Sequence, residues 1–236
     1  MILPVDVLSM RSESQTVFTG NTLDWGITDY SEALERQFSY VAEIRAGRQN
    51  DALIFTEHHP VYTLGVRRSA ASSILKRVPQ PAQQASAIPV IVSNRGGDAT
   101  YHGPGQIVGY PILSLEARKD LRAYLHDLEE VLIQTLKGLD LYAHRREGKT
   151  GVWIGQRKIA AIGIAVRAWV AYHGFALNVN NDLTPFKGIV PCGIPTAEGT
   201  VTSIAAELGQ PFDLESLKKS IAIEFWKKFS HPHPRL

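Results

Sequence analysis

Residues 152–179 read VWIGQRKIAAIGIAVRAWVAYHGFALNV and contain three apolar runs separated by short polar segments. The runs at 152–154 and 158–166 flank the turn Gly155-Gln156-Arg157, a pattern typical of a β-hairpin. The run at 172–179 predicts a further strand. Successive strands without intervening helices favour antiparallel pairing over a regular strand-helix alternation.

Outside this stretch, the chain contains both helical and strand patterns. Apolar residues at helical spacing predict helices at 29–46 and 121–139, and two shorter patterns predict closing helices at 203–208 and 214–229. Strands are expected at 52–57, 61–64, 89–93 and 107–113. Asp120, Thr202 and Asp213 are the expected N-caps, and Gly47 and Gly209 the expected helix ends. The sequence therefore predicts an α+β fold with a mixed, largely antiparallel sheet flanked by helices.

Composition and charge indicate a globular protein and exclude several other classes. The 236 residues are 44% hydrophobic with a net charge of +2, which suits a globular protein and demands no nucleic-acid partner. A single cysteine excludes an intrachain disulfide framework and a cysteine-cluster metal site. We expect one catalytic domain over 1–236 with its core at about 24–208, and a long surface loop at 67–87. The apolar runs are too short for a membrane span or a signal peptide, so we expect a cytoplasmic protein.

A glycine-rich segment between two predicted strands reads Arg95-Gly96-Gly97-Asp98-Ala99-Thr100-Tyr101-His102-Gly103-Pro104-Gly105-Gln106. Glycines let the backbone approach a ligand closely, while an arginine and a histidine add charge and a proton-transfer group. A plain glycine-rich hairpin is the alternative. The segment matches neither a dinucleotide fingerprint nor a phosphate-binding P-loop.

The single cysteine, Cys192, lies between Pro191 and Gly193. It is either a packing residue or a nucleophile, and a nucleophile needs a nearby base or cation to form its thiolate. Candidate activators are His102, His173 and Lys158, although Lys158 could equally be a solvated residue at the start of a strand. The histidines show no metal-ligand spacing, so no metal is expected.

Six blocks of this sequence together resemble the lipoyl(octanoyl) transferases, also called lipoate-protein ligase B. The blocks follow the family's order over about 24–208 and are Glu57-His58-His59-Pro60-Val61-Tyr62-Thr63-Leu64-Gly65, Arg95 to Gln106, Gly148 to Gly151, Arg157 to Gly163, His173 to Asn178 and Pro191-Cys192-Gly193. The combination is far more specific than any single block.

The resemblance implies a fold similar to the catalytic domains of biotin and lipoate protein ligases. It also implies transfer of an octanoyl group from acyl carrier protein to a lysine of lipoyl domains in 2-oxoacid dehydrogenases or the glycine-cleavage H protein. Cys192 would be the acyl-thioester nucleophile and Lys158 the residue that activates it and serves as general base. No ATP or metal would be needed, because the acyl group arrives on the phosphopantetheine of the carrier. The substrate site would be formed by Arg95, Gly96, Gly97, Asp98, Ala99, Thr100, Tyr101, His102, Ala161, Ile162, Gly163, Gly174, Phe175 and Ala176.

Three other functions remain open on the same residues. An ATP-dependent lipoate ligase of the same fold would activate its substrate as an adenylate. A non-catalytic acyl-binding module would keep the pocket without the chemistry. A thioester hydrolase would use the same nucleophile but admit water.

Overall fold

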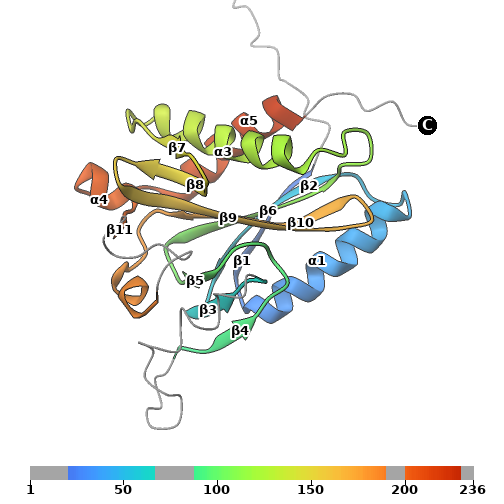
Figure 1. Ribbon diagram of the computed structural model, residues 1–236, viewed down its shortest axis with the longest axis horizontal. Helices are drawn as coiled ribbons and strands as arrows, with labels where there is room; N and C mark the ends of the chain where they lie inside the picture. Colours follow the sequence, from blue (N-terminus) through green and yellow to red (C-terminus); the bar gives the residue numbers. More distant parts are fainter. Residues whose placement is uncertain (1–20, 67–87, 190–199, 230–236) are drawn as a thin grey trace, which may run out of the picture.

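An eight-stranded mixed sheet forms the centre of the computed structural model, which describes residues 21–66, 88–189 and 200–229 (Figure 1). The strand order is β1-β2-β6-β10-β9-β8-β7, and β11 pairs with β9. β1 is parallel to β2 and β11 is parallel to β9, while the other neighbours are antiparallel. The bounds are β1 (Asn21–Thr28), β2 (Ala52–His58), β6 (Gln106–Ser114), β7 (His144–Arg146), β8 (Lys149–Ile154), β9 (Arg157–Arg167), β10 (Val170–Asn178) and β11 (Thr200–Val201). This topology confirms the predicted fold class.

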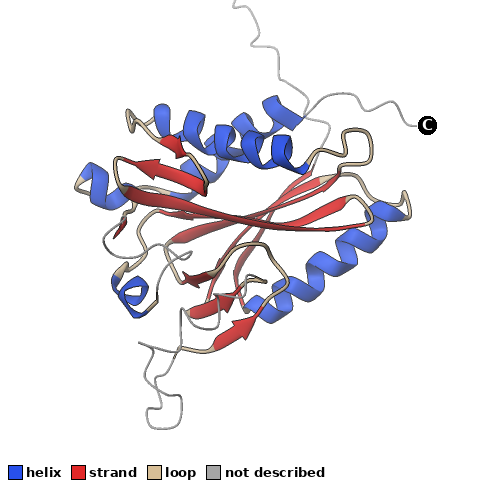
Figure 2. Ribbon diagram, viewed as in Figure 1, coloured by secondary structure: helices blue, strands red, loops and turns tan. Residues whose placement is uncertain are grey.

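Helices cover both faces of this sheet (Figure 2). α3 (Leu121–Lys137) and α5 (Leu214–Phe229) pack on one face, and α1 (Tyr30–Arg45) packs on the other. The inner strand β2, next to the edge strand β1, shows how the helices divide the core into two clusters. Leu53 and Phe55 join the cluster under α3 and α5, whereas Ala52 and Ile54 join the cluster under α1. Successive strand side chains point to opposite faces, so a strand buried on both faces is an uninterrupted apolar run.

A second sheet of three strands lies beside the main one in the order β4-β3-β5 (Figure 1). Its strands are β3 (Val61–Leu64), β4 (Val90–Val92) and β5 (Ala99–His102). β5 corrects the sequence-based expectation, because it occupies the middle of the segment 95–106 that was expected to be a loop. The strand pairs with β3 and is buried along its whole length.

The helix ends agree with the predicted caps except at one position. The side chains of Asp120 and Asp213 accept hydrogen bonds from the first turns of α3 and α5. The prediction that Thr202 caps α4 (Ile204–Leu208) is wrong. The N-cap is Ser203, whose side chain accepts a hydrogen bond from the amide of Ala206. Thr202 instead donates its hydroxyl to Glu207 over 2.6 Å.

The described part of the chain holds neither a membrane-spanning helix nor a cluster of metal-binding side chains. None of its helices has the length and apolar character needed to cross a membrane. Within the same residues, no three His, Cys, Asp or Glu side chains gather into a possible metal site. The expected loop at 67–87 lies outside the described residues.

Candidate active site

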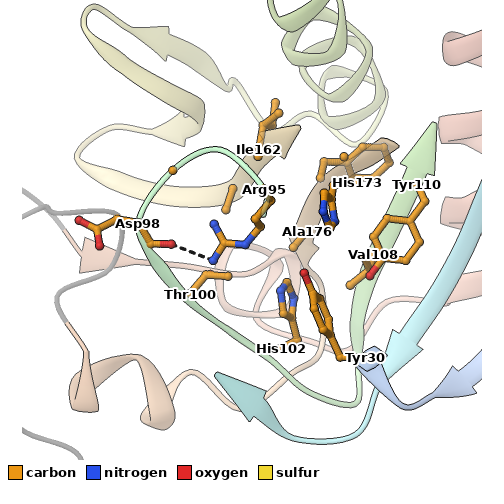
Figure 3. Close-up of a pocket in the computed structure, with 15 residues that line it drawn as sticks. Tyr30, Arg95, Asp98, Thr100, His102, Val108, Tyr110, Ile162, His173 and Ala176 are labelled. Atoms are coloured by element: carbon orange, nitrogen blue, oxygen red, sulfur yellow. Dashed lines mark hydrogen bonds between the residues drawn. The ribbon is translucent and has the colours of Figure 1, made fainter. Parts of the chain in front are cut away.

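Three segments that are distant in the sequence meet around one pocket, which we call the central pocket (Figure 3). They are the glycine-rich segment, the middle of β9 and the middle of β10. β9 and β10 are antiparallel neighbours with Ala161 opposite Ala176 and Gly163 opposite Gly174. The predicted site residues in its lining are Arg95, Gly97, Asp98, Thr100, His102, Ala161, Ile162, Gly163, Gly174, Phe175 and Ala176.

Three of the residues predicted to form the substrate site lie outside this lining. Gly96 lines an adjoining pocket instead. Ala99 and Tyr101 pack in an apolar cluster with Tyr62 and Phe186. Because β5 is a strand, its alternate residues Thr100 and His102 face the central pocket while these two face away from it.

Close backbone contacts explain why Gly163 and Gly174 cannot carry a side chain. The amide of Gly96 donates to the carbonyl of Ile164 over 2.8 Å, which fastens the glycine-rich segment across β9. A Cβ atom on Gly163 would lie 2.6 Å from the carbonyl oxygen of Gly96, and one on Gly174 would lie 2.2 Å from that of Gly109. Any side chain at these positions would push the pocket walls apart.

Arg95 is almost buried, at 8% exposure, and it holds the glycine-rich segment together. Its guanidinium donates to the carbonyl oxygens of Thr63, Gly96 and Asp98 over 2.8, 3.1 and 2.8 Å. It also donates to the hydroxyl of Thr63. Among the described residues, no carboxylate forms an ion pair with it. These bonds make Arg95 a support for the pocket wall as well as part of the lining.

His102 is a neutral group in this structure. Its Nδ1 donates to Oε1 of Gln106 over 2.8 Å, because the amide nitrogen of Gln106 donates to Tyr101 and Asn178. Burial, reinforced by the neighbouring His58 and Arg95, holds the pKa of His102 well below its usual range. An imidazole with so low a pKa is a weak base and carries no positive charge, which weakens the case for His102 as the activator.

His173 also lines the central pocket and is 2% exposed. Its Nε2 donates to Oδ1 of Asn94 over 2.7 Å, and its backbone φ is +57°. Burial, together with the charge of Arg95, lowers the pKa of His173 to about 3. The imidazole is therefore neutral at physiological pH.

Lys158 is 5% exposed, so the alternative of a solvated lysine is wrong. Its Nζ donates to the carbonyl oxygen of Thr150 over 3.0 Å and lies 4.9 Å from the ring centre of Trp153. Gly151 leaves room for the amine, since a Cβ there would lie 3.3 Å from Nζ. The amide of Gly151 is held in turn by Oε1 of Glu129 on α3, over 2.9 Å.

Lys158 lines two pockets that adjoin the central pocket. It shares one with Thr100, Ala161 and Ala176, and the other with Gly97 and Gly163. The structure thus brings Lys158 beside the walls formed by the three segments. Cys192, Pro191 and Gly193 lie outside the described residues.

Sequence reasoning missed the aromatic side of the central pocket, which Tyr30, Val108 and Tyr110 complete. The hydroxyl of Tyr110 donates to Nε2 of His58 over 2.6 Å, and burial lowers the pKa of His58 to about 4. Tyr30 and Tyr110 fall within periodic apolar patterns, which mark them as core residues. Periodicity alone carries no signal for their second role.

Residues 29–226 match the family model described as the lipoyl protein ligase A/B catalytic domain. The chain belongs to this family. A protein of Geobacter sp. (strain M21) named octanoyltransferase is 46% identical over 211 residues, which are 89% of this chain and 97% of that protein. Another of that name, from Rubrobacter xylanophilus, is 44% identical over 88% of this chain and 92% of its own. These matches confirm the predicted resemblance and the prediction of an acyltransferase.

Solved structures share the fold at low sequence identity. A crystal structure of lipoate-protein ligase A bound with ATP is similar with a TM-score of 0.70 and 17% identity, covering 89% of this chain and 85% of that chain. A biotin protein ligase from Aquifex aeolicus gives a TM-score of 0.51 and 10% identity, over 91% of this chain and 72% of that one. Both confirm the predicted similarity to biotin and lipoate ligase catalytic domains.

Proposed function

We propose that the chain is an octanoyltransferase that moves an octanoyl group from acyl carrier protein to a lysine of a lipoyl domain. The donor is the phosphopantetheine thioester of the carrier, and the acceptors are lipoyl domains of 2-oxoacid dehydrogenases or the glycine-cleavage H protein. The observation that carries the proposal is the buried amine of Lys158 beside the walls of the central pocket. The octanoyltransferase name of relatives at 46% and 44% identity supports the choice of acyl group.

In the first step the thiolate of Cys192 attacks the carbonyl carbon of the donor thioester. A new carbon-sulfur bond forms to Cys192 and the bond to the phosphopantetheine sulfur breaks. That sulfur leaves as a thiol with the proton that Lys158 removed from the Cys192 thiol, so the amine of Lys158 is free again. The product is an octanoyl-enzyme thioester.

In the second step Lys158 takes a proton from the acceptor lysine, whose free amine attacks the octanoyl-enzyme. The carbon-nitrogen bond of the amide forms and Cys192 leaves. The amine of Lys158 is suited to this role because Thr150 and Trp153 hold it in place beside the pocket. A thioester already carries the activation that an amide requires, so the reaction needs no ATP and no metal.

The central pocket can hold the alkyl chain. Val108, Ile162, Phe175 and Ala176 give it an apolar lining. Each methylene group removed from water there stabilises the bound acyl group by about 0.8 kcal/mol. The proposed reaction takes place in the cytoplasm, where carrier protein and acceptors meet.

The decisive assay mixes purified protein, octanoyl carrier protein and an unmodified lipoyl domain without ATP, and follows the mass of the lipoyl domain. We expect the acceptor to gain one octanoyl group, and an acceptor whose target lysine is replaced by arginine to gain none. Modification that requires ATP and free octanoate would instead indicate a ligase. Release of free octanoate would indicate a hydrolase, and binding without transfer would indicate an acyl-binding module.

A further inference from the structure

His173 has a backbone conformation that strands rarely contain. Its φ of +57° lies in the left-handed region, although the residue is in the middle of β10. Pairing between β10 and β6 continues on both sides, with Ala171 opposite Leu113 and Phe175 opposite Gly109. Residues held in such a conformation concentrate at functional sites.

Hydrogen bonds to Gln37 and Asn94 hold the backbone and the ring of His173 in place. The backbone amide of His173 donates to Oε1 of Gln37, a fully buried side chain of α1, over 2.8 Å. The ring is fixed by the bond from its Nε2 to Oδ1 of Asn94, over 2.7 Å. The amide nitrogen of Asn94 donates to the hydroxyl of Tyr172, which leaves Oδ1 as the acceptor.

The second ring nitrogen of His173 is a buried acceptor without a donor. Because Nε2 carries the hydrogen, Nδ1 has a free lone pair, and within the described residues it has no hydrogen-bond partner. The neighbouring tyrosine hydroxyls have other partners, whereas Nε2 of Gln37 is a second buried polar atom without a partner among the described residues. The hydroxyl of Tyr30 bonds to Ser93 over 2.8 Å, and that of Tyr110 bonds to His58. Leaving a buried acceptor unpaired is costly, so a ligand group is its natural partner.

The ring of His173 lies at the end of the central pocket that is remote from Lys158. Figure 3 shows the rings of His173, Tyr110, Tyr30 and His102 gathered at one end, with Arg95 and Asp98 toward the other. The adjoining pockets of Lys158 share Asp98, Gly163 and Ala161 with the central pocket but none of these four rings.

The separation between the amine of Lys158 and His173 along β9 suits a medium-length acyl chain. Gly151 places the amine of Lys158 near the level of Ala160, because a Cβ on Gly151 would meet both groups. His173 is opposite Ile164, four residues further along β9. Four strand residues span about 13 Å, which is longer than an extended eight-carbon chain and leaves length for a terminal hydroxyl and its hydrogen bond.

We propose that His173 is a specificity-determining residue at the far end of the central pocket, where its Nδ1 accepts a hydrogen bond from a hydroxyl on the last carbon of a medium-chain acyl group. The inference rests on the proposed function, since it takes the thioester end of the chain to lie near Lys158. The pocket then accepts ω-hydroxyacyl thioesters as well as plain alkyl ones. An end wall made only of apolar groups would reject such a hydroxyl.

The test compares two carrier-protein thioesters of matched size, 8-hydroxyoctanoyl and nonanoyl, whose chains differ by a hydroxyl in place of a methyl group. We expect the wild-type kcat/KM for the hydroxyl substrate to be at least equal to that for nonanoyl. A wild-type preference for nonanoyl of more than about tenfold would overturn the inference. Octanoyl carrier protein is assayed alongside. Transfer of octanoyl with rejection of the hydroxyl would overturn this inference alone, whereas no transfer of any acyl group would overturn the proposed function with it.

Variants then assign the effect to His173. His173→Phe keeps the ring shape without the acceptor, and we expect its ratio of hydroxyl to methyl kcat/KM to fall about tenfold. His173→Asn tolerates a left-handed φ and offers a carbonyl acceptor, so its ratio should stay within about threefold of wild type. Ile162→Val changes another lining residue and should leave the ratio unchanged. An unchanged ratio in His173→Phe, or an equal fall in Ile162→Val, would contradict the assignment.

Discussion

Lys158 Nζ donates to the carbonyl oxygen of Thr150 over 3.0 Å from a side chain that is 5% exposed. The ring of Trp153 lies under the same amine, 4.9 Å from it. Among the described residues, no carboxylate forms an ion pair with Lys158. A carbonyl and an aromatic face therefore hold the amine in position.

Replacing Lys158 by methionine should abolish most of the transfer while keeping the fold. Methionine fills a similar volume but provides no base, and loss of a general base typically lowers a rate by 10²- to 10⁴-fold. We expect kcat for octanoyl transfer to fall at least about 100-fold. Lys219→Met, on the exposed face of α5, is the matched control and should transfer normally. A Lys158→Met enzyme within fivefold of wild type would show that Lys158 is not the base.

Glu129 should act on Lys158 through the backbone of Gly151. Its Oε1 accepts from the Gly151 amide over 2.9 Å, and its Oε2 lies 3.2 Å from Nε of Arg145. Glu129→Ala leaves the Gly151 amide without its acceptor and removes one of the two carboxylates beside Arg145, which keeps Glu130. We therefore expect a loss of about 1–3 kcal/mol in the free energy of urea unfolding and a lower kcat. Glu129→Gln keeps an acceptor oxygen and should lose clearly less of both. Equal losses in the two variants would contradict a role for the Gly151 bond.

Gly163→Ala should disrupt the central pocket for steric reasons alone. The new Cβ would lie 2.6 Å from the carbonyl oxygen of Gly96, a contact that neither backbone can relieve without moving. We expect a higher KM for octanoyl carrier protein together with lower stability. Gly209→Ala is the comparison, because its φ of +73° makes alanine strained in otherwise open space far from the pocket. That variant should lose about 1–2 kcal/mol of stability and keep its KM. A normal KM in Gly163→Ala would contradict the close contact.

Stability should decrease as the pH falls from about 6.5 toward 4. Burial lowers the pKa of His58 to about 4, while an unfolded histidine titrates near 6.5. The unfolded state therefore binds the proton first, and this group's contribution is complete above about pH 6.5 and declines below it. At pH 5 the loss from His58 is about 2 kcal/mol.

Urea unfolding of wild type and His58→Gln at two pH values isolates this contribution. Other buried histidines titrate in both proteins, so only the difference between their pH dependences reports on His58. We expect the variant to lose less stability than wild type between about pH 7 and 5. Parallel pH dependences would show that His58 is not buried as a neutral group.

Much of the architecture follows from periodicity, but the site does not. Apolar spacing predicted α3 and the strands β9 and β10 to within a few residues. The strand β5 was missed because its buried residues are mostly polar and lie among glycines. β1 was missed as a parallel edge strand with an irregular register near Gly26, where few side chains are buried.

The chemistry of the site depends on contacts between distant segments. Lys158 contacts Thr150 and Trp153 on the paired strand β8, and although the hairpin is predicted, a lysine at the start of a strand gives no sign that its amine is buried. The left-handed φ of His173 is maintained by Gln37, 136 residues away in sequence. From the sequence, only the resemblance to a known family indicates that the three segments of the central pocket form one site.

The intact mass of the protein after incubation with octanoyl carrier protein tests the proposed mechanism most directly. The sequence holds a single cysteine, so a thioester adduct identifies its own position. The proposal predicts a gain of one octanoyl group that neutral hydroxylamine removes and that Cys192→Ala lacks. An unmodified wild-type protein that nevertheless transfers octanoate, or an adduct that persists in Cys192→Ala, would contradict it.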